Sequence, residues 1–304
     1  MRAAGLGATA LALVALVAVR PAGAQSSSPT PIDPRSLMTT PVWLVRGQQA
    51  VSQGTGFLFA STTPTDQIET VFLVTNYHVV TGHSPERGGA RRGERIRIIL
   101  HRDPSRPEDV QAVEMPIYDK DDRPLWIASE AHPAADVVLV PLPPEAYAAL
   151  RLFVFTEAHT RGDIRIRPTS GATLLGYAYG FYDTRHFLPV WKTGHVASEP
   201  DVDFEGRPVF LVDVSAFPGM SGSPVLAVAN GIYESEDGVM RSGRVLKLLG
   251  IFSSMPAVRE QRSMASPADP SAQQTVETTL ELGYVWKAAL IADLARSYRP
   301  VRRP

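Results

Sequence analysis

The stretch Phe217–Pro224, with the sequence FPGMSGSP, guides our interpretation of the whole chain. It places Ser221 between glycines, ends on a proline and precedes the apolar run 225–228. A serine in a glycine-rich turn ahead of a buried strand is typical of an exposed nucleophile. However, a serine hydroxyl is a weak nucleophile at neutral pH unless a base accepts its proton and a third group orients that base. Ser221 is therefore a candidate nucleophile only if the chain supplies both groups.

Both groups are present upstream of Ser221. His78 follows the apolar run 71–74, and Asp136 precedes the apolar run 137–140. Each has a structural alternative, because a histidine can simply end a strand and an aspartate commonly accepts hydrogen bonds in a turn. Their joint presence, in the order His78, Asp136, Ser221, predicts a catalytic triad. We expect no metal and no cofactor, since His78 and His83 lack a third ligand at a recognisable spacing.

In this order the three segments resemble the trypsin-like (chymotrypsin-fold) serine proteases, especially the bacterial cysteine-free branch that includes the HtrA and Deg type. Further motifs match in place: GTGF at 54–57, TGHVAS at 193–198 and LGI at 249–251. The resemblance covers about residues 42–294. It implies an all-β fold of two six-stranded antiparallel β-barrels, to which the helical spacing at 284–298 adds a C-terminal helix. Unlike many HtrA-type relatives, the chain is expected to have no PDZ-like domain after the protease unit.

The resemblance also implies roles for individual residues. Ser221 would attack a peptide carbonyl, His78 would accept its proton, and Asp136 would orient His78. The backbone N–H groups of Gly219 and Ser221 would form the oxyanion hole. The substrate-binding residues are expected to be Ser215, Ser253, Ser254 and Met255.

Two residues near the nucleophile, and one in the expected substrate pocket, depart from common members of the family. Ser223 stands where the family usually has a second glycine, and Met220 replaces a commoner polar residue. Ser215 falls where the trypsin subgroup carries an aspartate, which predicts an uncharged, small to medium aliphatic residue before the scissile bond. The alternative function is a catalytically weak protease-fold module that binds peptides or proteins, and a third is self-processing alone.

Short apolar runs of strand length, bounded by Gly, Pro, Asp or Ser, recur along the chain and independently indicate an all-β fold. The expected strands are 42–45, 56–60, 71–75, 95–100, 110–115, 125–128, 137–140, 164–166, 172–178, 189–192, 195–198, 209–214, 222–228 and 245–252. The domain boundaries that follow are an N-terminal barrel at 42–143, a connection at 144–160, a C-terminal barrel at 161–283 and a helix at 284–298. We expect loops at 82–93, which is basic and solvated, and at 253–279.

The N-terminus indicates export. Arg2 precedes the apolar run 6–19, and residues 21–24 have the small-x-small form of a signal-peptidase site, so we expect a signal peptide at 1–24 that is cleaved after Ala24. An uncleaved membrane anchor is the alternative. Residues 25–41 are rich in Ser, Pro and Thr and predict a flexible leader. We expect a periplasmic or secreted bacterial protein with no membrane span after cleavage.

Charge and cysteine content restrict the partners and the sources of stability. Removing Arg2 and Arg20 with the signal peptide leaves 28 basic against 31 acidic residues, a balance that argues against nucleic acid as a partner. The resemblance to the serine proteases implies protein or peptide substrates as the partners. The chain has no cysteine, so its stability must come from its core without disulfides.

Overall fold

The computed structural model of the protein describes residues 32–62, 67–178, 181–263 and 273–299. The predicted signal peptide and the start of the predicted leader lie outside these ranges. Within them the chain is built mainly of β-strands, and no helix is long and apolar enough to cross a membrane. The all-β fold with a C-terminal helix is therefore confirmed.

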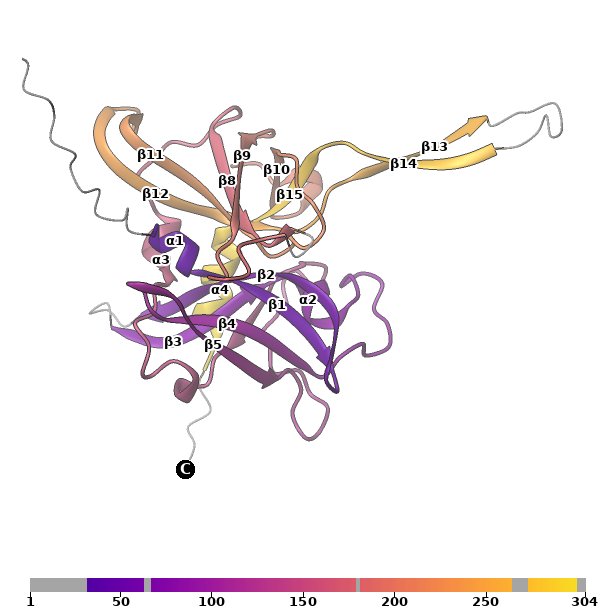
Figure 1. The fold of residues 1–304 in the computed structure, drawn as a ribbon. Helices are drawn as coiled ribbons and strands as arrows, with labels where there is room; N and C mark the ends of the chain where they lie inside the picture. The colour runs from indigo at the N-terminus through magenta and orange to yellow at the C-terminus, as the bar shows by residue number, and fades with distance from the viewer. Residues whose placement is uncertain (1–31, 63–66, 179–180, 264–272, 300–304) are drawn as a thin grey trace, which may run out of the picture. The chain divides into compact units, whose positions relative to one another are not determined.

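Six strands of the first half form an antiparallel sheet in the order β5-β4-β1-β2-β3-β6, and a short seventh strand, β7, pairs with β2 in parallel (Figure 1). They are β1 (Thr39–Arg46), β2 (Gln49–Thr62), β3 (Ile68–Thr75), β4 (Arg95–Asp103), β5 (Arg106–Pro116), β6 (Val138–Pro141) and β7 (Phe155–Thr156). Isolated hydrogen bonds connect the ends of this sheet near its two edge strands, β5 and β6. The Leu125 N–H donates to the Ile117 carbonyl just beyond β5, and Ile127 pairs with Leu139 of β6.

Strand β4 shows why these sequences form a half-covered sheet. Successive strand side chains point to opposite faces. Ile96 and Ile98 are completely buried, whereas Arg95 and Arg97 remain partly exposed and bind Glu114 of the neighbouring β5 at 2.7 and 2.9 Å. The alternating sequence therefore builds the core with one face and an ion-paired surface with the other.

Six strands of the second half form a closed barrel in the order β10-β15-β12-β11-β8-β9. They are β8 (Gly171–Gly176), β9 (Val190–Val196), β10 (Val209–Asp213), β11 (Pro224–Glu234), β12 (Met240–Phe252) and β15 (Leu282–Lys287). A separate hairpin of β13 (Ala257–Ser263) and β14 (Gln273–Thr279) extends away from this barrel (Figure 1). The remaining elements are α1 (Pro34–Leu37), α2 (Tyr77–Thr81), α3 (Glu157–Thr160), α4 (Ala288–Ser297) and the 3-10 turns η1 (Pro144–Ala146) and η3 (Phe204–Gly206).

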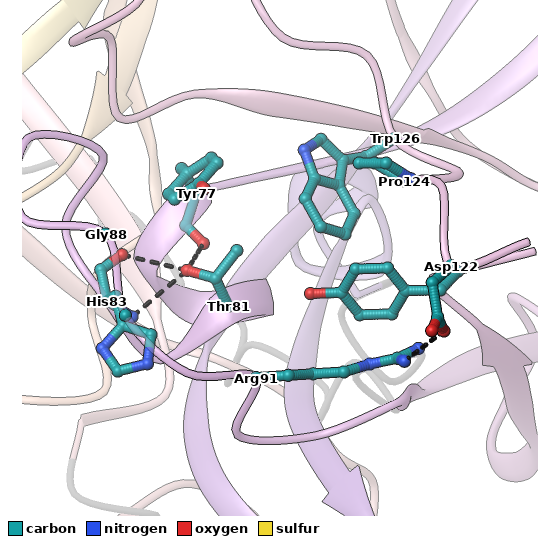
Figure 2. A pocket seen from close by; sticks show the side chains of 10 residues that line it. Tyr77, Thr81, His83, Gly88, Arg91, Asp122, Pro124 and Trp126 are labelled. Atoms are coloured by element: carbon teal, nitrogen blue, oxygen red, sulfur yellow. Dashed lines mark hydrogen bonds and ion pairs between the residues drawn. The ribbon is translucent and has the colours of Figure 1, made fainter.

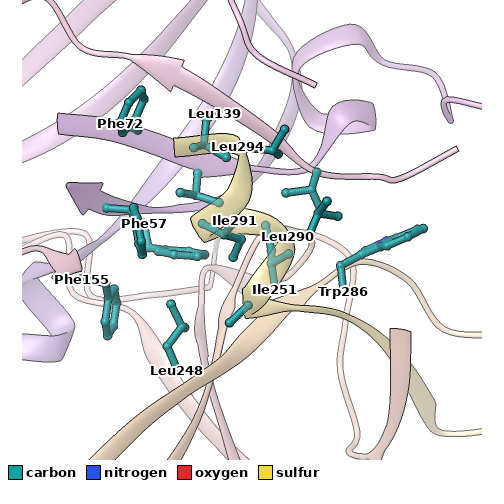
Figure 3. Close-up of a cluster of buried hydrophobic side chains, with 14 of the residues drawn as sticks. Phe57, Phe72, Leu139, Phe155, Leu248, Ile251, Trp286, Leu290, Ile291 and Leu294 are labelled. Atoms are coloured by element: carbon teal, nitrogen blue, oxygen red, sulfur yellow. The ribbon is translucent and has the colours of Figure 1, made fainter. Parts of the chain in front are cut away.

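Helix α4 contributes to a buried cluster that is shared by both halves of the molecule (Figure 3). Ile291 of α4 is completely buried there. The cluster also contains Phe57 and Phe72 from the first sheet and Ile251 and Trp286 from the second barrel. The helix therefore packs on both halves of the molecule.

The structure corrects several sequence-derived elements. The C-terminal helix begins at Ala288 and not at residue 284, because residues 282–287 pair with β10 and β12 to complete the barrel. The predicted strand at 125–128 is reduced to the single bridge at Ile127, and the one at 164–166 forms no strand. The predicted loop at 253–279 contains the β13–β14 hairpin. Helix α1 and the first residues of β1 lie in the stretch expected to be a flexible leader.

Candidate active site

His78, the predicted base, lies in the short helix α2 that follows β3 directly. Its ring Nδ1 lies 2.6 Å from Oδ2 of Asp136, and its backbone N–H donates to Oδ1 of the same carboxylate at 2.9 Å. Asp136 thus holds both the ring and the backbone of His78. Because Nδ1 faces a carboxylate, the neutral ring carries its proton on Nδ1 and presents a lone pair on Nε2.

Asp136 lies just before β6 and is 8% exposed. The Ser253 hydroxyl donates to its Oδ2 at 2.6 Å, and the Asn76 side-chain amide donates to its backbone carbonyl at 2.6 Å. Burial by itself raises the pKa of Asp136. The hydrogen bond and charge of His78 outweigh it, with help from the Ser253 hydroxyl and the His78 N–H, so that the pKa falls below its ordinary value. The carboxylate is therefore ionised at neutral pH.

Ser221, the predicted nucleophile, lies in two consecutive hydrogen-bonded turns ahead of β11. The Met220 N–H donates to the Phe217 carbonyl and the Ser223 N–H donates to the Met220 carbonyl, both at 3.0 Å. The turn requires glycine at position 222, where φ is +93° and a Cβ atom would lie 1.8 Å from the Thr55 carbonyl oxygen. The sequence around Ser221 therefore forms the tight turn that its glycines predicted.

The two predicted oxyanion donors are available. The backbone N–H groups of Gly219 and Ser221 donate to no acceptor within the described residues, although the N–H groups of Met220, Gly222 and Ser223 between and after them all do. Unpaired N–H groups beside a nucleophile are what the binding of a negatively charged oxygen requires.

One hydrogen-bonded path joins the three predicted triad residues. The Ser221 hydroxyl donates to the Ser253 backbone carbonyl at 2.9 Å, and the Ser253 hydroxyl donates to Asp136, which binds His78. In the described part of the chain no hydrogen bond connects Ser221 directly to His78. The structure thus gathers His78, Asp136 and Ser221 around Ser253.

The four predicted substrate-binding residues occupy different positions. Ser253 reaches the triad, as described above. Ser254 pairs with β15, since its carbonyl accepts the Tyr284 N–H at 2.9 Å, and Met255 is half-buried against the core of the second barrel. Ser215 is exposed on the segment between β10 and the nucleophile turn. Of these four described residues, only Ser253 makes hydrogen bonds with triad residues.

Met220 and Ser223, the two residues near the nucleophile that differ from common family members, are both buried. Met220 is completely buried in the core of the second barrel. Ser223 is also completely buried, and its hydroxyl has no hydrogen-bond partner among the described residues. Its space depends on Gly176, because a Cβ atom there would lie 2.2 Å from Ser223 Oγ. A small residue at 176 therefore accommodates the serine that replaces the family's usual glycine.

A cavity of about 320 Å³ lies beside α2, lined in part by Tyr77 and Trp126 (Figure 2). The guanidinium of Arg91 lies 3.6 Å from the centre of the Tyr118 ring and binds Asp122 at 2.6 Å. Arg91 belongs to the loop that the sequence predicts to be basic and solvated. Residues 86–92 of this loop are exposed, in agreement with that prediction, and the Arg91 charge is also paired with neighbouring side chains.

With this geometry established, we compared the chain with known proteins. The family model for the trypsin-like peptidase domain matches residues 54–232, more than half of the chain. The chain belongs to this family. The match includes all three predicted triad residues and both predicted oxyanion donors. No curated protein matches the sequence.

Solved structures similar to this chain include two proteases. The serine endoprotease from Yersinia pestis is 14% identical, with a TM-score of 0.41, over 86% of this chain and 64% of that chain. The catalytically active tobacco etch virus protease in complex with product is 10% identical, with a TM-score of 0.43, over 86% of this chain and 80% of that chain. This chain thus spans less than two thirds of the length of the Yersinia chain.

Sequence reasoning missed three contributions to the site. It assigned Ser253 to substrate binding, but the side chain donates to Asp136. It did not identify Asn76, whose side chain holds the Asp136 backbone, or Thr55, which contacts the nucleophile turn. The sequence identified Thr55 only as part of the strand motif GTGF. The contacts of Ser253, Asn76 and Thr55 form between segments distant in sequence, so no local pattern predicts them.

Proposed function

We propose that this peptidase is an exported serine endopeptidase that hydrolyses peptide bonds through Ser221, His78 and Asp136. The observation that carries the proposal is the hydrogen-bonded path through Ser253, which gathers a hydroxyl nucleophile, an imidazole and a buried carboxylate. Acyl transfer by a serine needs these three groups in these roles. The residue at position 221 is a serine, so the intermediate is an ester.

The first half of the reaction forms this acyl-enzyme. The Ser221 hydroxyl leaves the Ser253 carbonyl, gives its proton to His78 Nε2 and attacks the peptide carbonyl carbon. The carbonyl oxygen becomes an oxyanion, which the N–H groups of Gly219 and Ser221 stabilise. His78 then passes the proton to the leaving nitrogen as the C–N bond breaks, and Asp136 stabilises the transient imidazolium.

The second half regenerates the enzyme. A water molecule gives a proton to His78 Nε2 and attacks the ester carbonyl, and the oxyanion forms again at the same two N–H groups. Collapse of this intermediate breaks the bond to Ser221 Oγ, which recovers its proton from His78. The product carboxylic acid leaves, and atoms and charge balance over the cycle.

Export is part of the proposal. It is supported by the apolar run at 6–19, the small-x-small pattern at 21–24 and the absence of cysteine. Mass measurement of the protein recovered from the periplasm or medium of a bacterial host should give an N-terminus at Gln25. An intact N-terminus held in the membrane fraction would refute cleavage.

Labelling of the mature protein with a fluorophosphonate at about pH 8 tests the nucleophile, because an ordinary histidine is neutral there. We expect the label at Ser221, none in Ser221→Ala, and slower labelling in His78→Ala. An unlabelled but folded wild-type protein would refute the proposal. Binding of extended peptides without release of products would then support the binding module.

A further inference from the structure

Thr55 of β2 makes four hydrogen bonds beside the nucleophile turn and is completely buried. Its backbone N–H donates to the Ser221 carbonyl at 2.8 Å, and its hydroxyl donates to the Gly219 carbonyl at 2.8 Å. The same hydroxyl accepts the Tyr177 N–H at 3.0 Å, while the Thr55 carbonyl accepts the Thr75 hydroxyl at 2.7 Å. One residue of the first sheet thus holds the carbonyls of both residues whose N–H groups form the predicted oxyanion hole.

The direction of the hydroxyl hydrogen bond is determined by its neighbours. A backbone N–H can only donate, so the Thr55 oxygen must accept from Tyr177. A backbone carbonyl can only accept, so the single hydroxyl proton is directed to Gly219. In this arrangement a serine would serve as well as a threonine, whereas a valine would leave both backbone groups unpaired.

Gly219 is the residue of the turn that most needs such a restraint. Its φ of +94° lies in a region that glycine enters freely, and it has no side chain to limit rotation. Each peptide unit is planar, so holding the Gly219 carbonyl fixes the plane of the 219–220 peptide. The orientation of the Gly219 N–H relative to this plane then depends only on the two torsions of one residue.

We propose that the Thr55 hydroxyl is a positioning device for the oxyanion hole, holding Gly219 in the conformation that directs its N–H to the substrate oxygen. This inference rests on the proposed function, because it assigns no separate chemistry to Thr55. Thr55 is a positioning residue and touches no reacting atom. Its effect should therefore appear where the oxyanion is stabilised and not where the substrate is bound.

Thr55→Val, Thr55→Cys and Thr55→Ser form the test series. Valine removes the donor, cysteine provides a weaker one of similar size, and serine retains it. Thr75→Val is the matched control, since it deletes another completely buried hydroxyl that binds Thr55 but leaves the Gly219 hydrogen bond in place. All variants are made in the full mature chain, and their active sites are counted by fluorophosphonate labelling.

The readouts are kcat and KM per labelled site, and the inhibition constant of a peptide aldehyde, whose hemiacetal oxygen occupies the oxyanion hole. Removing one oxyanion donor outright typically lowers kcat about 10²–10³-fold. In Thr55→Val the Gly219 N–H is still present but misdirected. We therefore expect kcat to fall about tenfold or more, with KM within about twofold of the wild-type value. The aldehyde should weaken by a similar factor, Thr55→Cys should be intermediate, and Thr55→Ser and Thr75→Val should stay near wild type.

The outcomes separate this inference from the proposed function. A wild-type protein that neither labels nor cleaves would refute the function and, with it, the role of Thr55. An active wild type with unchanged kcat and aldehyde affinity in Thr55→Val, or in Thr55→Cys where valine prevents folding, would refute the Thr55 inference alone. Equal losses in Thr75→Val would show general loosening of the site and would also refute it.

Discussion

Replacing Ser223 with alanine should increase the free energy of unfolding, although the residue is completely buried beside the nucleophile. The reason is that its hydroxyl has no hydrogen-bond partner among the described residues. An unpaired buried hydroxyl costs about 1–3 kcal/mol of desolvation. Alanine keeps the Cβ contacts, and the void left by one oxygen atom costs only a few tenths of a kcal/mol at about 24 cal/mol per Å³. We therefore expect a net gain of about 1 kcal/mol.

Ser235→Ala provides the matched control for this measurement. Ser235 is also completely buried, but its hydroxyl donates to the Val239 carbonyl at 2.7 Å. Alanine removes this hydrogen bond and the one that the same hydroxyl makes with the Asp237 carboxylate, while the Ser235 N–H still donates to the Val239 carbonyl, so this variant should lose about 1 kcal/mol. The two serine-to-alanine changes are thus expected to have opposite signs.

Urea unfolding followed by tryptophan fluorescence and circular dichroism measures both changes. The denaturation midpoint should rise for Ser223→Ala and fall for Ser235→Ala, with the slope m unchanged in each. A midpoint that falls equally in both variants would show that the Ser223 hydroxyl has a partner of similar strength. That result would refute our account of how the turn accommodates serine.

Further predictions concern the triad, the packing beside the nucleophile and the shared core. Asp136→Asn should lower kcat by about 10⁴-fold in peptide hydrolysis with folding retained, because the carboxylate no longer holds the proton on His78 Nδ1; a loss below tenfold would contradict the triad. The pKa of Asp136 is lowered in the folded state, so its ionised form stabilises the protein above the unfolded pKa of about 3.9, and this contribution is lost as the pH falls through the folded value. The difference in unfolding free energy between wild type and Asp136→Asn should accordingly shrink in acid titrations, and a constant difference would rule out the linkage. Gly176→Ala should be destabilising, and Ser223→Gly should recover part of the loss in a double-mutant cycle, since a Cβ at 176 would lie 2.2 Å from Ser223 Oγ; strict additivity would contradict the contact. Ile291→Ala should cost about 2–5 kcal/mol in chemical unfolding, because the side chain is completely buried between the two halves; a change under 1 kcal/mol would show that α4 is not part of the core.

The strands that the sequence predicted correctly are those whose apolar pattern is local. Residues 95–98 alternate between arginine and isoleucine, and the isoleucines became buried residues of β4 as expected. The C-terminal helix was predicted four residues too early because Val285 has helical spacing with Ala288 and Ile291 but is also a buried strand residue. Residues 282–287 form a strand because they pair with β10 and β12, and no local sequence pattern reveals that pairing.

The sequence was enough to predict which residue types form the site and their order along the chain. His78, Asp136 and Ser221 stand next to apolar runs that place them at the ends of strands, so their types and their flanking glycines were enough to predict a triad. The sequence could not predict that the Ser253 hydroxyl binds Asp136 or that the Thr55 hydroxyl binds Gly219. These partners are 117 and 164 residues apart, respectively.

The sequence by itself determined the all-β class, the family and the identity of the candidate nucleophile, because turn glycines, strand periodicity and residue types act over a few neighbouring residues. Only the tertiary structure decided which hydroxyls support the site and how a serine fits at position 223. Those outcomes depend on single hydrogen bonds and on small spaces between segments far apart in the chain. The packing of the two halves brings together the hydrogen-bond partners, whereas the space for Ser223 lies beside Gly176 within the second barrel.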